Sequence, residues 1–349
     1  MLTIDGSRYS GSGTIVRQAV AFSALTGRPI HMVKARGKRE KPGLRPQHIR
    51  VVQAIAELVN GEVDGLSQGS QEFTFRPGPL KTGRHYHWGI GSAGSTTMLA
   101  LGVLPVLAFA GSPVSVELRG GLFQDFAPSA FHLQHVLLPL LESMGCPAEL
   151  LVERPGYVPS GQGILHLRMT PVMKSFGPLV REEPGDVTRI WGIALSSHLE
   201  ERRVSERMAD AARAVLGTIG YRTEIEVRHD TQSLQRGAAL ALFADEGPGV
   251  RLGADQAGAL RRRAESIGKH VAKQLCQEMQ SGATLDRFAA DQIIPFAALA
   301  DGESRFLIPT ATDHVMTSAW LAELFLGAQI KIEGQRMVIH GSGFRPKYE

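Results

Sequence analysis

The stretch at residues 10–33, SGSGTIVRQAVAFSALTGRPIHMV, contains the pattern that decides the fold. A start rich in glycine and serine is followed by an apolar run, a glycine and a short run of β-forming residues. This order predicts a helix with free amides at its N-terminus, a left-handed glycine at its end and a strand that packs the helix on a sheet. The same pattern recurs at residues 91–118 and, with a polar start, at residues 313–334. The recurrence predicts repeated βα units.

A second kind of helix is expected between these copies, from the apolar patterns at residues 46–61, 128–145 and 267–282. The resulting order favours an α+β fold of three tandem βαβαββ-like repeats. Residues 182–263 differ in composition and have their own order of strand, helix, strand and strand, which is typical of an inserted domain. We therefore expect a large domain formed by residues 1–181 and 264–349, with a smaller α/β domain, residues 182–263, inserted before the third repeat.

Composition sets broad limits on the kind of protein. The 349 residues are 43% hydrophobic and 21% charged, so the chain can bury a substantial core and is not generally disordered. Only two cysteines are present, Cys146 and Cys276, which excludes a disulfide framework or a cysteine-based zinc cage and favours a reducing cytoplasm. The N-terminus lacks the pattern of a signal peptide, and the longest apolar run, residues 96–111, is shorter than the about 20 residues of a membrane span. We expect a soluble cytoplasmic protein with no membrane partner.

The net charge of +4 is modest, but basic residues gather in the loop at residues 34–50. This loop follows a predicted strand and precedes a predicted helix, a junction where backbone amides and the helix dipole favour a phosphate. Arginines there could bind phosphate oxygens with two hydrogen bonds each. A solvent-exposed charged loop is an equally acceptable interpretation of this segment alone.

The two Gly/Ser segments, residues 11–14 and 91–95, each stand at the start of a predicted helix. Neither matches the P-loop or the dinucleotide-binding glycine pattern, and each alone is explained by a tight turn and an N-cap. Together with the basic loop, however, they could converge on one site for a polyanion.

His314 stands at the polar start of the last repeated helix. A neutral imidazole in that position could attack a phosphorus atom while neighbouring donors bind the oxyanions. The alternative is a surface or capping role. The pairs His132 with His135 and His85 with His87 could bind a metal, but HExxH and carboxylates at ligand spacing are absent from the sequence, so we give this interpretation less weight.

Several strings of residues together carry a family resemblance that covers nearly the whole chain. They are Asp5-Gly6 with Gly11, Gly13 and Arg17; residues 36–43 with Gln47-His48; IGSAGS at residues 90–95; Gly120-Gly121 with Ala127-Pro128; Ala290-Asp291-Gln292; and His314 with Thr317. In this order they resemble the RNA 3′-terminal phosphate cyclase family. The family fold, three α+β repeats with a small domain inserted before the third, agrees with the organisation predicted above.

The resemblance implies an ATP-dependent reaction at an RNA 3′ end. His314 would attack the α-phosphate of ATP to form a covalent histidine-AMP adduct, the AMP would pass to a 3′-phosphate, and the neighbouring 2′-OH would displace it to leave a 2′,3′-cyclic phosphate. The implied partners are ATP, RNA and a divalent metal, usually Mg²⁺, whose ligands stay unassigned. Carried over by position, the implied ATP-binding residues are Arg36, Arg39, Gln47, Pro128, Phe288, Asp291 and Gln292, with Pro128 and Phe288 on either side of the adenine. The implied residues for RNA or phosphate are Arg17, Lys38, Lys41 and Arg45.

The sequence also departs from the family pattern. Ser10 replaces a glutamate, Thr14 and Leu101 each replace a glutamine, Leu122 replaces the threonine of Gly-Gly-Thr, and Phe288 replaces a tyrosine. With these departures, the resemblance supports adenylation of His314 better than it supports the identity of the acceptor. A nucleotidyltransferase with another phosphate or carboxylate acceptor therefore stays open, as does an RNA-binding scaffold without turnover, although the retained His314 argues against a scaffold. The oligomeric state stays unassigned.

Overall fold

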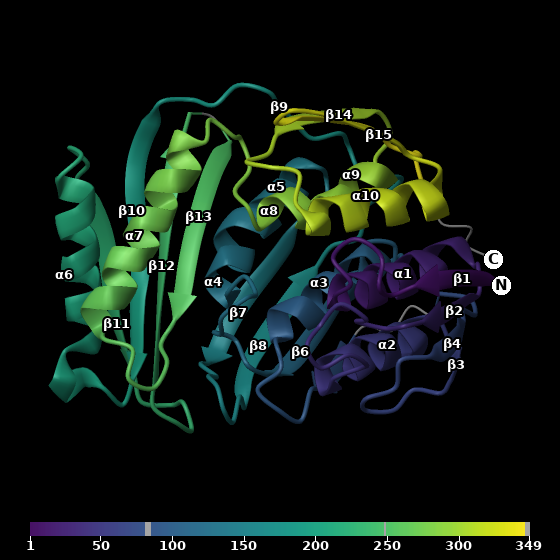
Figure 1. Cartoon of the computed structure of the whole chain (residues 1–349), viewed down its shortest axis with the longest axis horizontal. Coiled ribbons are helices and arrows are strands. Elements are labelled where there is room, and N and C mark those ends of the chain that lie inside the picture. The colour runs from purple at the N-terminus through teal and green to yellow at the C-terminus, as the bar shows by residue number, and fades with distance from the viewer. Residues whose placement is uncertain (81–84, 248, 346–349) are drawn as a thin grey trace.

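The computed structural model describes residues 1–80, 85–247 and 249–345. Its strands form four sheets of four strands each, with helices packed on them (Figure 1). This mixed arrangement confirms the α+β class.

The first sheet has the order β1-β2-β4-β3. Its strands pair in parallel between β1 and β2 and antiparallel between the others. The helices α1 and α2 connect them, and the bounds are β1 (Leu2–Asp5), α1 (Gly13–Thr26), β2 (Ile30–Val33), α2 (Pro46–Leu58), β3 (Glu62–Asp64) and β4 (Phe73–Arg76).

The second sheet has the order β5-β6-β8-β7 and the third the order β9-β14-β16-β15. Both repeat the directions of the first sheet, one parallel pair followed by two antiparallel pairs. The bounds in the second are β5 (His85–Gly89), α3 (Thr96–Leu107), β6 (Val114–Gly120), α4 (Ala130–His132), the π-helical turn η1 (Leu133–Leu137), α5 (Leu138–Ser143), β7 (Ala148–Arg154) and β8 (Gly163–Met169). Those in the third are β9 (Val180–Arg181), α8 (Ala289–Gln292), α9 (Ile294–Leu299), β14 (Glu303–Leu307), α10 (Asp313–Leu326), β15 (Gln329–Glu333) and β16 (Arg336–His340).

The three helices expected from the repeated pattern are α1, α3 and α10, and α1 packs against both of the others. Ser12, Ser95 and Thr312 cap their N-termini with side-chain hydrogen bonds. Gly27 and Gly327 end α1 and α10 with φ of 69° and 68°, a conformation that costs glycine little. Because α3 already ends at Leu107, Gly111 lies in the following turn and does not cap it.

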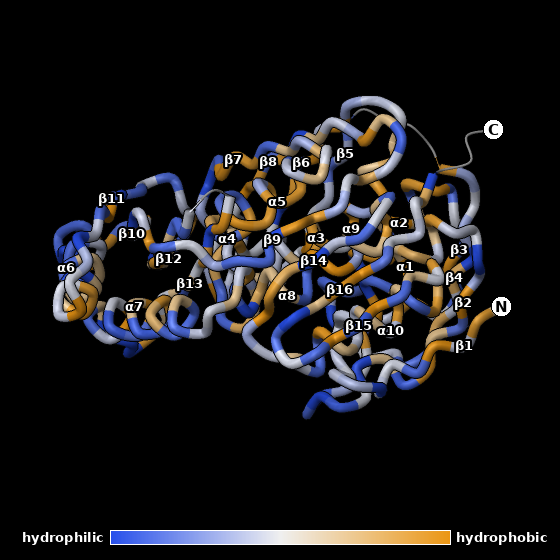
Figure 2. Tube along the Cα trace, turned by 90° about the horizontal axis from the view of Figure 1, so that it is seen from above, coloured by the Kyte–Doolittle hydropathy of each residue, from blue (hydrophilic) through white to orange (hydrophobic). Residues whose placement is uncertain are grey.

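The fourth sheet has the order β11-β10-β12-β13, and α6 and α7 pack on it. It lies at one end of the molecule in both Figure 1 and Figure 2. The bounds are β10 (Val187–Ser197), the 3₁₀ turn η2 (Glu200–Arg202), α6 (Val204–Gly217), β11 (Thr223–Asp230), β12 (Gly237–Glu246), β13 (Val250–Ala257) and α7 (Ala264–Gln280).

The extent of this unit differs from the expected residues 182–263. Ile267, Val271 and Leu275 of α7 share a separate apolar core with α6 and the fourth sheet. The helix that we expected in the third repeat therefore packs on the inserted sheet, and the compact unit runs through residues 187–280. We call residues 187–280 the inserted unit below.

The main core lies under α1, α3, α9 and α10, joins the first three sheets and extends to one face of the fourth sheet through β10 and β12. Within the described residues, every helix is too short or too polar to cross a lipid bilayer.

Candidate active site

His314 lies in the first turn of α10, two residues after the Thr312 cap. Its side chain is 42% exposed, so it can reach a ligand. Burial lowers the pKa of His314 below its usual 6.5, and the positive charges of Arg17 and Arg39 lower it further, against a smaller opposing effect of Asp313. The imidazole is therefore uncharged at neutral pH and keeps a lone pair for attack.

The start of α1 is joined to His314 by polar side chains. Thr14 Oγ1 lies 3.0 Å from His314 Nδ1, and Arg17 Nη2 donates to the same Thr14 oxygen at 3.3 Å. One turn away on each helix, Gln18 donates to Ser318 Oγ at 2.8 Å. Polar side chains of α1 and α10 thus contact each other along one line between two helices that are otherwise mostly apolar.

Ser10 occupies the place where the resemblance implies a carboxylate. Its hydroxyl lies 2.8 Å from Thr317 Oγ1 and 3.0 Å from Ser12 Oγ. The Ser10 amide also donates to Thr317 Oγ1 at 3.2 Å. In this chain a network of neutral hydroxyls therefore joins the glycine loop to α10.

Asp291 lies at the end of α8 that is near His314. Its Oδ2 is 4.0 Å from His314 Nδ1, too far for a hydrogen bond, and accepts from Gln292 Nε2 at 2.7 Å. Burial raises the pKa of Asp291 to about 7, although the charge of Arg17 acts in the opposite direction. Both protonation states of this carboxyl are populated near neutral pH.

Positive charge gathers around the buried His48. Burial, followed by the charges of Arg17, Arg36, Arg45 and Arg39, lowers the pKa of His48 to about 3. Burial also lowers the pKa of Arg17 to about 10, which leaves it charged at neutral pH. The structure thus brings four of the predicted basic residues to one place, a concentration of charge that suits a polyanion.

Not every basic residue of the loop points at a ligand. Arg36 Nη1 donates to the carbonyl oxygens of Lys41 and Gly43 at 2.9 and 2.7 Å, so this side chain shapes the loop. Lys38 Nζ donates to the carbonyl of Tyr9 at 2.6 Å, next to the glycine loop. Arg45 uses its backbone amide to donate to His48 Nδ1 at 3.0 Å at the start of α2.

Two close contacts explain why glycine and glutamine occupy their positions. A β-carbon at Gly13 would lie 2.2 Å from His48 Nε2, so only glycine lets the basic loop approach α1. Gln47 Oε1 accepts from the amide of Ser95 at 2.9 Å, which joins the basic loop to the second Gly/Ser segment. The predicted convergence of both segments with the basic loop is therefore observed.

The two residues expected beside the adenine lie on segments next to this cluster. Phe288 directly precedes α8, and its ring centroid is 5.5 Å from that of His132 in an edge-to-face contact. The carbonyl of Pro128 accepts from Thr97 Oγ1 at 2.8 Å, near the N-terminus of α3.

Three of the four histidines considered as metal ligands have other partners. His132 pairs with Asp286, His135 packs against Trp191, and His87 lies 3.6 Å from Glu117. Across residues 1–80, 85–247 and 249–345, no three or more His, Cys, Asp or Glu side chains gather closely enough to hold a metal ion. The described residues therefore do not form a metal site of their own.

A groove of about 780 Å³ lies on the second sheet and is lined by His85, His87 and His166 among others. Its lining includes no residue of the basic loop, α1, α8 or α10. We place the candidate site at His314 because the uncharged imidazole, the carboxyl of Asp291 and the arginines converge there.

Sequence analysis missed the partners Gln18 and Ser318. The signal was present: Thr14, Arg17 and Gln18 have the spacing i, i+3, i+4, and so do His314, Thr317 and Ser318. Polar residues at this spacing share one face of a helix. On two helices that are otherwise apolar, such a stripe indicates that the polar faces meet.

An uncharged histidine beside clustered arginines, in an α+β protein, defines a site suited to chemistry on phosphate groups. Residues 8–332 match the family described as RNA 3′-terminal phosphate cyclase. The chain belongs to this family.

The chain is similar to curated relatives over nearly its whole length. It is 38% identical over 340 residues to the RNA 3′-terminal phosphate cyclase of Methanopyrus kandleri, with 96% of each chain covered. It is 37% identical to that of Hyperthermus butylicus, covering 97% of this chain and 95% of the relative. A solved structure, the enolpyruvyl transferase NikO from Streptomyces tendae, aligns with 97% of this chain and 49% of its own at 13% identity and a TM-score of 0.43, too distant to support an argument.

Proposed function

We propose that this chain converts an RNA 3′-terminal phosphate to a 2′,3′-cyclic phosphate, using ATP and a covalent histidine-AMP intermediate at His314. The similarity to relatives named RNA 3′-terminal phosphate cyclase supports the overall reaction. The observation that carries the proposed mechanism is the depressed pKa of His314 beside clustered arginines, because attack on phosphorus needs an uncharged imidazole and a place for the phosphate charge.

In the first step His314 Nε2 attacks the α-phosphorus of ATP. The bond between this phosphorus and the bridging oxygen breaks, and pyrophosphate leaves. Nε2 is the nucleophile because Nδ1 faces Thr14 Oγ1 at 3.0 Å. In the tautomer that carries its proton on Nδ1, His314 donates that proton to Thr14 and leaves the Nε2 lone pair free.

In the second step an oxygen of the RNA 3′-phosphate attacks the adenylyl phosphorus and the N–P bond breaks, which restores the neutral imidazole. In the third step the 2′-oxygen attacks the 3′-phosphorus, the 2′-hydroxyl loses its proton and AMP leaves. Asp291 is suited to take up a proton near His314, because burial raises its pKa to about 7.

Arg17, Arg39 and Arg45 would bind the triphosphate and the RNA phosphate, with Lys38 and Lys41 at the edge of the site. Arg36 would act by shaping the loop, as its two carbonyl contacts indicate. Gln47, Asp291 and Gln292 would line the nucleotide, and Pro128 and Phe288 would hold the adenine. A divalent ion such as Mg²⁺ would arrive bound to the phosphates of ATP, since it commonly uses substrate oxygens and few protein ligands.

Labelling with ATP that carries ³²P at the α-phosphate tests the first step. We expect acid-labile, alkali-stable label on the wild type and none on His314→Ala. Adding RNA with a 3′-phosphate should discharge the label and give an end that resists phosphatase. Labelled protein that leaves the RNA end unchanged would instead identify a nucleotidyltransferase with another acceptor. Unlabelled wild type that still binds RNA would identify a scaffold.

A further inference from the structure

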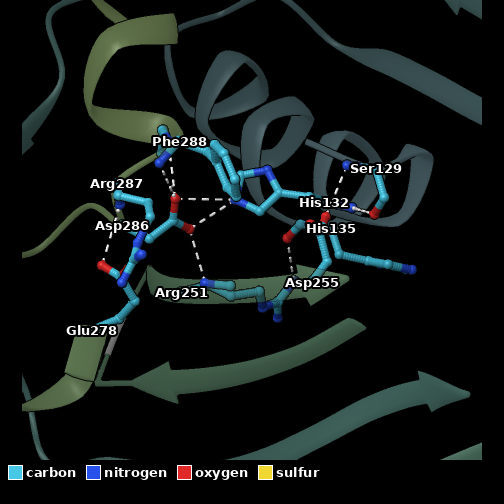
Figure 3. A network of polar contacts seen from close by, with 11 residues as sticks. Ser129, His132, His135, Arg251, Asp255, Glu278, Asp286, Arg287 and Phe288 are labelled. Atoms are coloured by element: carbon cyan, nitrogen blue, oxygen red, sulfur yellow. Dashed lines mark hydrogen bonds and ion pairs between the residues drawn. The ribbon is translucent and has the colours of Figure 1, made fainter. Parts of the chain in front are cut away.

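A buried ion pair lies between the repeats and the inserted unit. His132 Nε2 donates to both carboxylate oxygens of Asp286, at 3.0 and 2.9 Å, and both side chains are fully buried (Figure 3). Burial favours the uncharged imidazole, but the charge and hydrogen bonds of Asp286 outweigh it and raise the pKa of His132. His132 Nδ1 has no hydrogen-bond partner among the described residues, so Asp286 provides the polar contact that orients this ring.

Asp286 joins three segments that are distant in the sequence. Besides His132 of α4, its carboxylate accepts from the amide of Gly253 in β13 at 2.8 Å. It also accepts from the amides of Phe288 and Ala289, both at 2.9 Å, at the start of α8. One buried carboxylate thus holds α4, α8 and the inserted unit together (Figure 3).

The same network reaches the segment of Pro128. The amide of Ser129, the next residue, donates to Asp255 Oδ2 of β13 at 2.8 Å. Asp255 is half-buried and raises the pKa of His132 through its charge. Both residues expected beside the adenine are therefore attached to β13, Phe288 through Asp286 and Pro128 through Ser129.

We propose that His132, Asp286 and Asp255 are positioning residues that set the spacing of Phe288 and Pro128 for the adenine of ATP. This inference rests on the proposed function. It makes ATP use depend on the inserted unit, although that unit contributes none of the residues expected to touch the nucleotide. The direct contact is the edge-to-face packing of the His132 and Phe288 rings.

Asp286→Asn separates this role from a general loss of folding. The amide oxygen of asparagine can replace Oδ1, which accepts from Phe288 and Ala289, and so keep the turn before α8. The amide nitrogen would replace Oδ2 and face the donors His132 and Gly253, so the Gly253 contact and one of the two His132 contacts are lost, as is the negative charge opposite His132. We expect the ATP concentration for half-maximal labelling of His314 to rise about tenfold. The labelling rate at saturating ATP should change less than about twofold.

Gly253→Ala tests the same contact from the other side, should Asp286→Asn fail to fold. Its added β-carbon would lie 2.8 Å from His132 Cδ2 and displace the ring. The matched control is Glu265→Gln, which breaks an exposed ion pair with Arg207 inside the inserted unit and should leave ATP use unchanged.

A double-mutant cycle that combines Asp286→Asn with Phe288→Ala tests whether the network acts on ATP binding through Phe288. If the network acts through Phe288, adding Asp286→Asn to Phe288→Ala should raise the half-maximal ATP concentration by less than about twofold. If the two substitutions instead raise the half-maximal ATP concentration independently, so that their effects multiply, the proposal is overturned. A wild-type half-maximal ATP concentration in both Asp286→Asn and Gly253→Ala would also overturn it. If the wild type takes up no label, both the proposed function and this inference fail. If the wild type is labelled normally and the variants Asp286→Asn and Gly253→Ala use ATP as the wild type does, only this inference fails.

Discussion

Thr14 Oγ1 lies 3.0 Å from His314 Nδ1, although 300 residues separate the two in the sequence. The contact exists because α1 and α10 pack with their polar stripes facing each other. Because His314 Nδ1 contacts Thr14, Nε2 is the ring nitrogen that can react with a substrate. Arg17 donates to the same Thr14 oxygen, so this hydroxyl can accept two hydrogen bonds at once.

Thr14→Val removes this contact with little change of shape. We expect labelling of His314 by ATP to slow by about three- to tenfold, the value of one hydrogen bond, because the imidazole loses the group that fixes its tautomer. The measurement is the single-turnover labelling rate at saturating ATP. Thr26→Val at the other end of α1, where the hydroxyl donates to the helix carbonyl of Phe22, is the control, and equal rates in both variants would contradict the prediction.

The labelling rate should fall as the pH drops below about 6.5, because protonation of His314 consumes its lone pair. The midpoint should lie below 6.5, since burial, Arg17 and Arg39 lower the pKa. Arg39→Gln removes one positive charge and should shift the midpoint to higher pH. Asp291 titrates near pH 7 in the same site, so its variant Asp291→Asn is needed to separate the two groups. A midpoint that does not move in Arg39→Gln would show that this charge does not act on His314.

Arg39→Ala should raise the apparent KM for ATP more than it weakens RNA binding. The charge of Arg39 acts on both His48 and His314, which places it within reach of both histidines. We expect about a tenfold rise, typical of a lost charge-assisted hydrogen bond. Titration with ATP and with a 3′-phosphorylated RNA would measure the two effects. Arg222→Ala, an exposed residue before β11, serves as the control of equal charge.

Gly13→Ala should destabilise the fold by about 1–3 kcal/mol and reduce labelling, because its β-carbon would overlap His48 Nε2. Thermal unfolding together with labelling would show both effects. Gly217→Ala near the end of α6 is the matched control, since a β-carbon there meets no atom within 4 Å and should leave stability equal or higher. Wild-type stability in Gly13→Ala would mean that His48 can move aside freely.

Local signals predicted the parts of the fold that depend on neighbouring residues. The caps Ser12 and Thr312 and the glycines Gly27 and Gly327 follow from helix-end chemistry, which acts within one turn. The apolar periodicity of α7 was equally clear, but an amphipathic pattern states only that one face is buried. It does not say which sheet covers that face, and for this reason α7 was expected in the wrong unit.

The sequence predicted those residues of the candidate site that differ in type or charge from their neighbours in the sequence. His314 and the basic loop stand out as a histidine at a helix start and as a local excess of charge. The pair of His132 and Asp286 does not stand out, because 154 residues separate two common residue types and the pairing depends on tertiary packing. His132 was therefore considered as a metal ligand, whereas the structure gives it a carboxylate partner.

The arginines around His48 also affect the stability of the whole protein. Four like charges face one buried imidazole, and they repel each other whenever no anion lies between them. The unfolded chain takes up a proton on His48 as the pH falls below 6.5, while the folded chain does so only near pH 3, so folding weakens across this window. A bound polyphosphate would neutralise the arginines and raise the melting temperature. Repulsion among these arginines therefore lowers the stability of the folded protein, and an anion bound between them would restore it.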